Sequence, residues 1–210
     1  LHNTLFPYTT LFRSGAPAPA ARVTLLVHLY CPIFSLFHSI TYSMPYPKQL
    51  VDPMRKELTD LGVEELLDAD DVDTAMDEAQ EGTSLLVINS VCGCAAKNAR
   101  PAVRASMEAD VQPDRYMTVF AGQHLEATER MREYLRGVPP SSPFMALFKD
   151  GDPVFILERR HIEGRSARAI GNDLVEAYRK YCAEDAEVGE EPERPDLDES
   201  AGETTDTFRS

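Results

Sequence analysis

The sequence predicts an α/β domain in which a central mixed four-stranded sheet is flanked by helices. Short apolar runs that fit buried strands alternate with segments whose apolar residues recur at helical spacing. A strand–helix–strand unit is followed by a helix, by two strands around an Asp150-Gly151 turn, and by a closing helix. Right-handed crossovers make the first two strands parallel and the hairpin antiparallel to them. This layout is thioredoxin-like.

The first half of the domain is predicted to contain helices on either side of one buried strand. Helical spacing of apolar residues predicts an amphipathic helix over 47–60 and one or two short helical pieces over 63–80. The nearly continuous apolar run 83–90 predicts a strand that is buried on both faces. The segment from 94 to about 109 predicts a helix, which Pro101 should kink because proline removes one backbone donor.

The second half supplies three strands and two helices. The segment 115–122 predicts a strand, and 125–137 predicts a helix that ends at Gly137. Residues 143–159 fit two strands joined by a tight turn, and 166–182 a last helix. The chain shows no internal repeat.

Composition divides the chain into three parts. Residues 1–43 contain neither acidic residues nor methionine, and their opening resembles a translated sequencing adaptor. We expect a non-native or unstructured extension there, with translation starting at Met44. Residues 44–182 carry the folded domain. Residues 183–210 hold 11 acidic residues against two arginines, and we expect a disordered acidic tail because such a segment cannot bury enough apolar surface.

Charge and cysteine content exclude some classes of protein. A formal charge of -14 argues against nucleic-acid binding, because no basic stripe is available to neutralise phosphates. Four cysteines in 210 residues are too few for a disulfide scaffold and favour a cytoplasmic protein. The segment 23–42 is apolar, but polar residues and Pro32 interrupt it and no clean cleavage site follows. We therefore expect neither a nucleic-acid partner nor a membrane.

The sequence Cys92-Gly93-Cys94 lies where the 83–90 strand ends and the next helix begins. The thiolate is the reactive form of cysteine, and a helix N-terminus favours negative charge, so Cys92 is predicted to be reactive. Gly93 supplies the backbone freedom that a disulfide across one residue demands. A strained disulfide is reduced readily, so the pattern favours redox exchange.

Two other interpretations of the cysteine pair stay open. Two thiolates one residue apart can chelate zinc, and His161 or Cys182 could complete such a site, although no second close pair of ligands is present. The pair could also be inert, which its strand-to-helix position disfavours. We expect no metal.

Other residues are predicted to approach the same site. Pro143 begins a strand antiparallel to the cysteine-bearing one; a cis proline there lets Ser142 offer backbone groups to an extended substrate. The last strand ends nearby with Arg159, Arg160 and His161, which could support the thiolate or bind an anionic substrate. The alternative for Pro143 is an ordinary turn proline, and the alternative for residues 159–161 is a solvated loop.

Three residues are expected to stay outside the site. His124 fits a plain surface residue, Cys182 a bystander thiol at the end of the last helix, and Cys31 lies in the doubtful first segment.

Over Met44 to about Cys182 the chain resembles the bacilliredoxins, which are thioredoxin-like proteins with a CGC motif. The resemblance is carried by QLVDPMRKELTDLGVEEL, VINSVCGCAAKNARPAV, TVFAGQHLEATERMREYLRGVPPSSPFMALFKDG and RRHIEG. Lys97 stands where the family often has a small residue.

The resemblance implies thiol–disulfide exchange on proteins capped by bacillithiol, a low-molecular-weight thiol. Cys92 would take the bacillithiol onto itself, and Cys94 or a second bacillithiol would release it. The implied partners are bacillithiolated client proteins and a bacillithiol-linked reductase system, with bacillithiol as co-substrate and no tightly bound cofactor. Some members have been regarded as disulfide isomerases. A general isomerase and a zinc-binding or redox-sensing interaction module remain alternatives.

Overall fold

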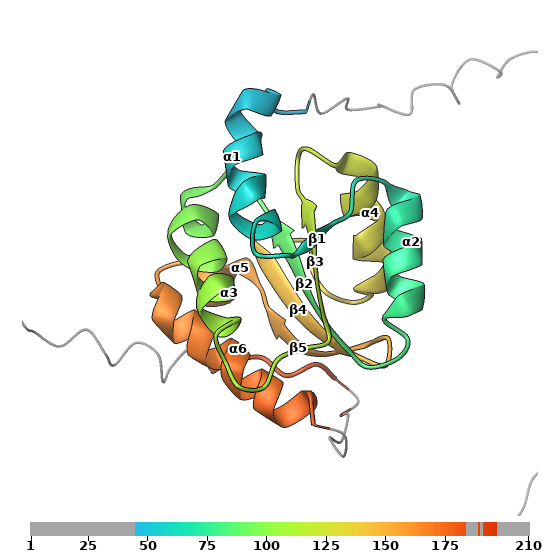
Figure 1. The fold of residues 1–210 in the computed structure, drawn as a ribbon, viewed down its shortest axis with the longest axis vertical. Coiled ribbons are helices and arrows are strands. Elements are labelled where there is room, and N and C mark those ends of the chain that lie inside the picture. The colour runs from blue at the N-terminus through green and yellow to red at the C-terminus, as the bar shows by residue number, and fades with distance from the viewer. Residues whose placement is uncertain (1–44, 184–188, 190, 197–210) are drawn as a thin grey trace, which may run out of the picture. The chain divides into compact units, whose positions relative to one another are not determined.

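A five-stranded mixed sheet lies at the centre of the domain (Figure 1). The computed structural model describes residues 45–183, 189 and 191–196. The elements are α1 (Lys48–Thr59), β1 (Glu64–Glu65), α2 (Ala69–Glu78), β2 (Thr83–Asn89), η1 (Ala95–Ala99), α3 (Arg100–Ser106), β3 (Arg115–Phe120), α4 (Leu125–Tyr134), β4 (Phe144–Lys149), β5 (Asp152–Leu157), α5 (Arg159–Ile162) and α6 (Ala167–Tyr181).

The sheet has the order β1-β3-β2-β4-β5. β2 is parallel to β3 and antiparallel to β4, and β4 forms the predicted hairpin with β5. This topology confirms the thioredoxin-like prediction, with one strand more than expected. The additional strand, β1, is parallel to β3 and falls in the segment predicted to be helical over 63–80. Because it has only two residues, it is too short for an alternating pattern to reveal it.

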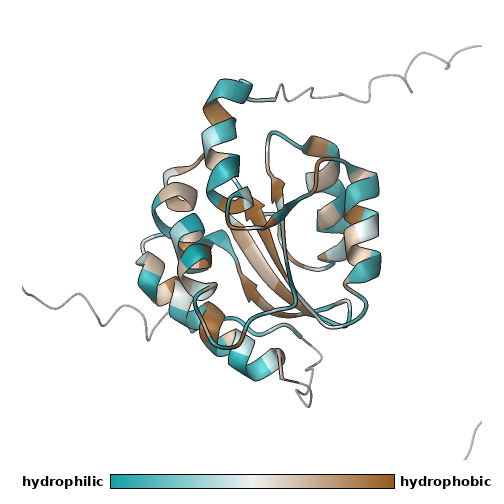
Figure 2. Ribbon diagram, viewed as in Figure 1, coloured by the Kyte–Doolittle hydropathy of each residue, from teal (hydrophilic) through white to brown (hydrophobic). Residues whose placement is uncertain are grey.

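β2 is buried on both faces, as its apolar run predicts. All seven of its residues are buried, and successive side chains of a strand point to opposite faces. Leu85 and Val87 belong to the core cluster that α3 and α6 cover, whereas Leu86 and Ile88 belong to the cluster covered by α2 and α4. In Figure 1 these helices flank the sheet on two sides, and Figure 2 shows the central strands as mainly hydrophobic.

The helix predicted from residue 94 departs from α-helical geometry directly after Cys94. Ala95–Ala99 form a π-helical turn, in which the Arg100 N–H reaches the Ala95 carbonyl, and α3 follows. Pro101 lies in the first turn of α3, so the departure from α-helical geometry directly precedes the proline that was expected to kink the helix. α3 ends at Ser106, slightly earlier than predicted.

Part of the acidic tail docks on the edge of the sheet. The Glu193 N–H donates to the Val154 carbonyl at 2.9 Å, and the Glu193 carbonyl accepts from the Ile156 N–H at 2.8 Å. The Glu193 carboxylate also accepts hydrogen bonds from Lys180 and Tyr181 at 2.6 and 2.7 Å.

The prediction of a disordered tail over the whole of 183–210 is therefore wrong for 191–196. An edge strand presents unpaired backbone groups that another segment can pair with, and this pairing needs no apolar side chain. Charge composition consequently gives no sign of it.

Within the described part of the chain, no helix is both long and apolar enough to cross a membrane. The apolar segment 23–42, the expected start at Met44 and Cys31 lie outside the described residues.

Candidate active site

The cysteine pair lies in the turn directly after the carboxyl end of β2. Helical structure begins at residues 93–94, so Cys92 occupies the position that precedes the helix. The register pairs Ile88 of β2 with Phe144 of β4, which brings the preceding Pro143 to the same end of the sheet. The Ser142–Pro143 peptide bond is cis, as expected. Binding of an extended substrate by Ser142 stays a prediction.

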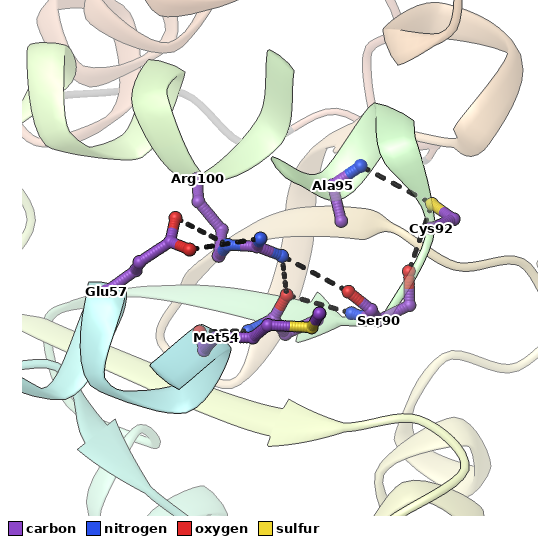
Figure 3. Close-up of polar contacts among 7 residues, drawn as sticks. Met54, Glu57, Ser90, Cys92, Ala95 and Arg100 are labelled. Atoms are coloured by element: carbon purple, nitrogen blue, oxygen red, sulfur yellow. Dashed lines mark hydrogen bonds and ion pairs between the residues drawn. The ribbon is translucent and has the colours of Figure 1, made fainter. Parts of the chain in front are cut away.

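The two sulfurs point toward one another. Cys92 Sγ and Cys94 Sγ are 2.7 Å apart, and both cysteines are free thiols that are partly exposed. Cys92 Sγ also accepts hydrogen bonds from the Ser90 hydroxyl at 3.2 Å and from the Ala95 N–H at 3.4 Å (Figure 3). The Ala95 contact is the kind that a capping side chain makes with the first turn of a helix.

These contacts favour the thiolate of Cys92. Burial opposes ionisation, but hydrogen bonds from Cys94, Ser90 and the Ala95 N–H, together with the charge of Arg159, outweigh it and lower the pKa of Cys92. Burial raises the pKa of Cys94, and the hydrogen bond with Cys92 and the negative charge there raise it further. Cys92 is thus the more readily ionised of the two thiols, which is what a nucleophile and a resolving cysteine require.

Gly93 is exposed, and its backbone φ is not positive. A Cβ at this position would meet no atom within 4 Å. The dithiol form therefore does not require glycine at position 93. The predicted need for backbone freedom applies to the disulfide form alone.

Arg159 is the arginine of the RRHIEG segment that lies within electrostatic range of both sulfurs. Its side chain is 45% exposed and pairs with Glu163 at 3.2 Å. The hydrogen bond to Glu163 and the negative charges that Cys94 and Cys92 carry when ionised raise the pKa of Arg159. Its recognition of an anionic substrate stays a prediction.

Arg160 and His161 are engaged elsewhere. Arg160 pairs with the Glu158 carboxylate at 3.0 Å. His161 is 2% exposed, and its Nδ1 accepts a hydrogen bond from the Glu158 N–H at 3.0 Å, which caps α5. Burial and the neighbouring Arg160 lower the pKa of His161. His161 therefore does not give the Cys92 thiolate the expected electrostatic support, because its ring is neutral at pH 7.

Cys182 lies at the other end of the sheet. It is close to Thr83, the first residue of β2, whereas Cys92 follows the last residue of that strand. Seven residues of strand span roughly 20 Å, so Cys182 neither completes a metal site with Cys92 nor exchanges with it. Burial raises the pKa of this thiol. His124 is half-buried at the start of α4 and not a plain surface residue.

Among the residues described, no three His, Cys, Asp or Glu side chains lie close enough together to hold a metal ion. Lys97 is exposed in the π-helical turn.

A buried polar network that was not predicted from the sequence lies next to the cysteines. Arg100 is 3% exposed and binds the carboxylate of Glu57 through two nitrogens, at 2.8 and 3.2 Å. A third nitrogen donates to Asn89 Oδ1 at 3.1 Å and to the Ser90 carbonyl at 3.2 Å. An arginine on a helix is ordinarily solvent-exposed, so its sequence position gave no signal.

Comparison with known proteins places this site in a family context. A family model described as disulphide isomerase matches residues 46–182. A bacilliredoxin of Salinibacter ruber is 62% identical over 168 residues, which cover 80% of this chain and 99% of that protein. Bacilliredoxin BH1716 of Halalkalibacterium halodurans is 53% identical over 137 residues, covering 65% of this chain and 94% of that protein.

Among solved structures, oxidised thioredoxin from Plasmodium falciparum aligns with a TM-score of 0.38 and 16% identity. The alignment covers 55% of this chain and 97% of that chain.

Proposed function

Since the chain belongs to the bacilliredoxin family, we propose that this thiol–disulfide oxidoreductase removes bacillithiol from mixed disulfides on client proteins, with Cys92 as the nucleophile. The observation that carries the proposal is the arrangement of the two sulfurs. Cys92 accepts three hydrogen bonds that stabilise its thiolate, and one of them comes from the thiol that would resolve the intermediate.

In the first step, the Cys92 thiolate attacks the bacillithiol sulfur of the mixed disulfide. A new disulfide forms between Cys92 and bacillithiol, and the client leaves as a thiolate. A thiolate is the nucleophile in such exchange, so the lowered pKa of Cys92 increases the reactive fraction at neutral pH.

In the second step, Cys94 attacks Cys92 Sγ, and the intramolecular disulfide forms as bacillithiol leaves. The proton of Cys94 passes to the departing thiolate. Cys94 is 2.7 Å away and needs no large movement to react. A second bacillithiol is an alternative attacking thiol. A bacillithiol-linked reductase system then supplies the two electrons that restore the dithiol.

The exchange needs a small thiol and a reducing compartment. Bacillithiol serves as a co-substrate, and no tightly bound cofactor takes part in the exchange. The compartment is the cytoplasm, where thiols are kept reduced. The strongly acidic chain is unsuited to nucleic acid.

The test uses a client protein that carries bacillithiol in a mixed disulfide. Cys92→Ser should lose release activity, whereas Cys94→Ser should accumulate Cys92 linked to bacillithiol, which intact mass identifies. Cys182→Ser is the matched control and should retain full activity, because that thiol lies at the opposite end of β2. Full activity in both Cys92→Ser and Cys94→Ser would refute the proposal.

The description of the matching family model favours one second candidate, a general disulfide isomerase. An isomerase would refold a protein with scrambled disulfides in the absence of any added small thiol. Release of bacillithiol without such refolding would exclude this candidate.

A further inference from the structure

Ser90 is fixed on both sides of its peptide backbone. Its N–H donates to Asn89 Oδ1 at 2.8 Å, and its carbonyl accepts from Arg100 at 3.2 Å. The residue is 6% exposed, and its hydroxyl is left to donate to Cys92 Sγ at 3.2 Å. The direction of this hydroxyl therefore depends on the groups that hold the Ser90 backbone (Figure 3).

Arg100 joins the three elements that meet behind the cysteines. It lies at the start of α3, it binds Glu57 of α1, and it binds the end of β2 through Asn89 and Ser90. Asn89 is itself anchored to α1, because its amide donates to the Met54 carbonyl at 3.3 Å. A planar guanidinium spreads its donors over three nitrogens and can hold a carboxylate with two of them while the third contacts Asn89 and Ser90. An ammonium group has all its donors on one nitrogen and cannot reproduce the two-nitrogen contact.

We propose that Arg100 is a positioning residue of the reactive site, which holds the Ser90 backbone so that the Ser90 hydroxyl stays directed at the Cys92 sulfur. Its charge is paired with the Glu57 carboxylate through two hydrogen bonds, so the net field that it adds at the sulfur is small. Arg100 consequently acts through Ser90. The inference rests on the proposed role of Cys92 as nucleophile.

The experiment measures the rate at which iodoacetamide alkylates Cys92, as a function of pH, with the modified peptide identified by mass spectrometry. Ser90→Ala should slow alkylation roughly three- to tenfold at about pH 6, which is the range for loss of one hydrogen bond. Arg100→Lys keeps the charge but cannot bind Glu57 and the Ser90 carbonyl together, and it should slow alkylation by a similar factor. At high pH the rates of all variants should converge, because Cys92 is then ionised in each.

The double variant Ser90→Ala/Arg100→Lys decides whether Arg100 works through Ser90. Under the proposal its rate equals that of Ser90→Ala alone, because the only affected hydrogen bond is already absent. An alkylation rate unchanged in Arg100→Lys, or a double variant slower by the product of the two factors, would overturn the proposal.

Arg55→Lys is the matched control. Arg55 makes the same kind of two-nitrogen contact, from α1 to Glu65 of β1, and does not contact the end of β2. Arg55→Lys should leave the alkylation rate of Cys92 unchanged at every pH. Slowing as large as that in Arg100→Lys would contradict the proposal, because loss of any such contact would then have the same effect.

If Arg100→Lys does not fold, Glu57→Ala replaces it. This substitution removes the partner of the guanidinium from a side chain that is 41% exposed. A direct electrostatic role for Arg100 predicts faster alkylation once its charge is unpaired, whereas loss of positioning predicts slower alkylation. The two outcomes have opposite signs.

The same measurement separates this inference from the proposed function. Faster alkylation of Cys94 than of Cys92 in the unaltered protein would refute the nucleophile assignment itself. Preferential alkylation of Cys92, with no effect of Arg100→Lys, would refute the positioning role alone.

Discussion

Cys92 Sγ and Cys94 Sγ share a hydrogen bond across 2.7 Å, in which either sulfur can be the donor. With Cys94 as the donor, this bond helps to lower the pKa of Cys92, and it adds to the effect of burial in raising the pKa of Cys94. The thiolate of Cys92 gains a donor, while Cys94 must give up that bond, next to a negative charge, in order to ionise. Two cysteines separated by one glycine are therefore chemically unequal before any substrate arrives.

This inequality predicts which thiol reacts and why. Cys94→Ala removes the donor and should slow alkylation of Cys92 roughly three- to tenfold at neutral pH, the effect of losing one hydrogen bond. Cys94→Ser retains a hydroxyl donor and should slow it less. Rates from mass-mapped alkylation between about pH 5 and pH 10 check this prediction, and equal slowing in both variants would contradict it.

The two adjacent arginines of the α5 turn should differ in their effect on Cys92. Arg159→Gln removes a charge that favours the thiolate, and should slow Cys92 alkylation roughly two- to threefold at low ionic strength, with the difference shrinking as salt screens the interaction. Arg160→Gln is the matched control, because both arginines pair with a carboxylate but it is the charge of Arg159 that acts on the two thiols. An equal effect of both substitutions would argue against a specific role for Arg159.

Removal of the docked tail segment 191–196 should expose the edge strand β5, and the Ile156 N–H should report this. A chain ending at residue 183 should exchange the Ile156 N–H roughly tenfold faster, because its acceptor, the Glu193 carbonyl, is gone. A chain ending at residue 196 keeps that acceptor and should exchange like the full chain. Hydrogen exchange followed by NMR distinguishes the two, and equal protection in both would show that Glu193 does not cover this edge.

His161 should make stability depend on pH. Its pKa is lowered in the folded state by burial, so the unfolded chain binds the proton more tightly. The stability from the neutral ring is complete above the unfolded pKa of about 6.5 and is lost as pH falls below it toward the folded pKa. His161→Asn keeps an acceptor for the Glu158 N–H but does not titrate there.

The free energy of unfolding of His161→Asn should therefore fall less steeply between about pH 6.5 and pH 5 than that of the unaltered chain. Burial also lowers the pKa of His124, which acts in the same direction, so part of the slope should remain. Denaturant unfolding at several pH values measures both slopes, and identical slopes would contradict the prediction.

The elements of the fold could be predicted because their signals are local. The continuous apolar run of β2, the Asp150-Gly151 turn and the helical spacing of α6 each lie within one short segment. The position of Cys92 at the end of a buried strand follows from these signals and from right-handed crossover. β1 escaped prediction because two residues carry no periodicity.

The sequence by itself thus determined the thioredoxin-like topology and the place of the Cys92–Cys94 pair within it. Only the tertiary structure decided which groups surround that pair. Arg100 and Glu57 are 43 positions apart. His161 is buried in the cap of α5, whereas Arg159 pairs with Glu163 and lies close enough for its charge to act on the sulfurs. Spacing along a chain fixes which face of an element a residue occupies. Contacts between elements depend on how those elements pack, and that arrangement is set by the whole core.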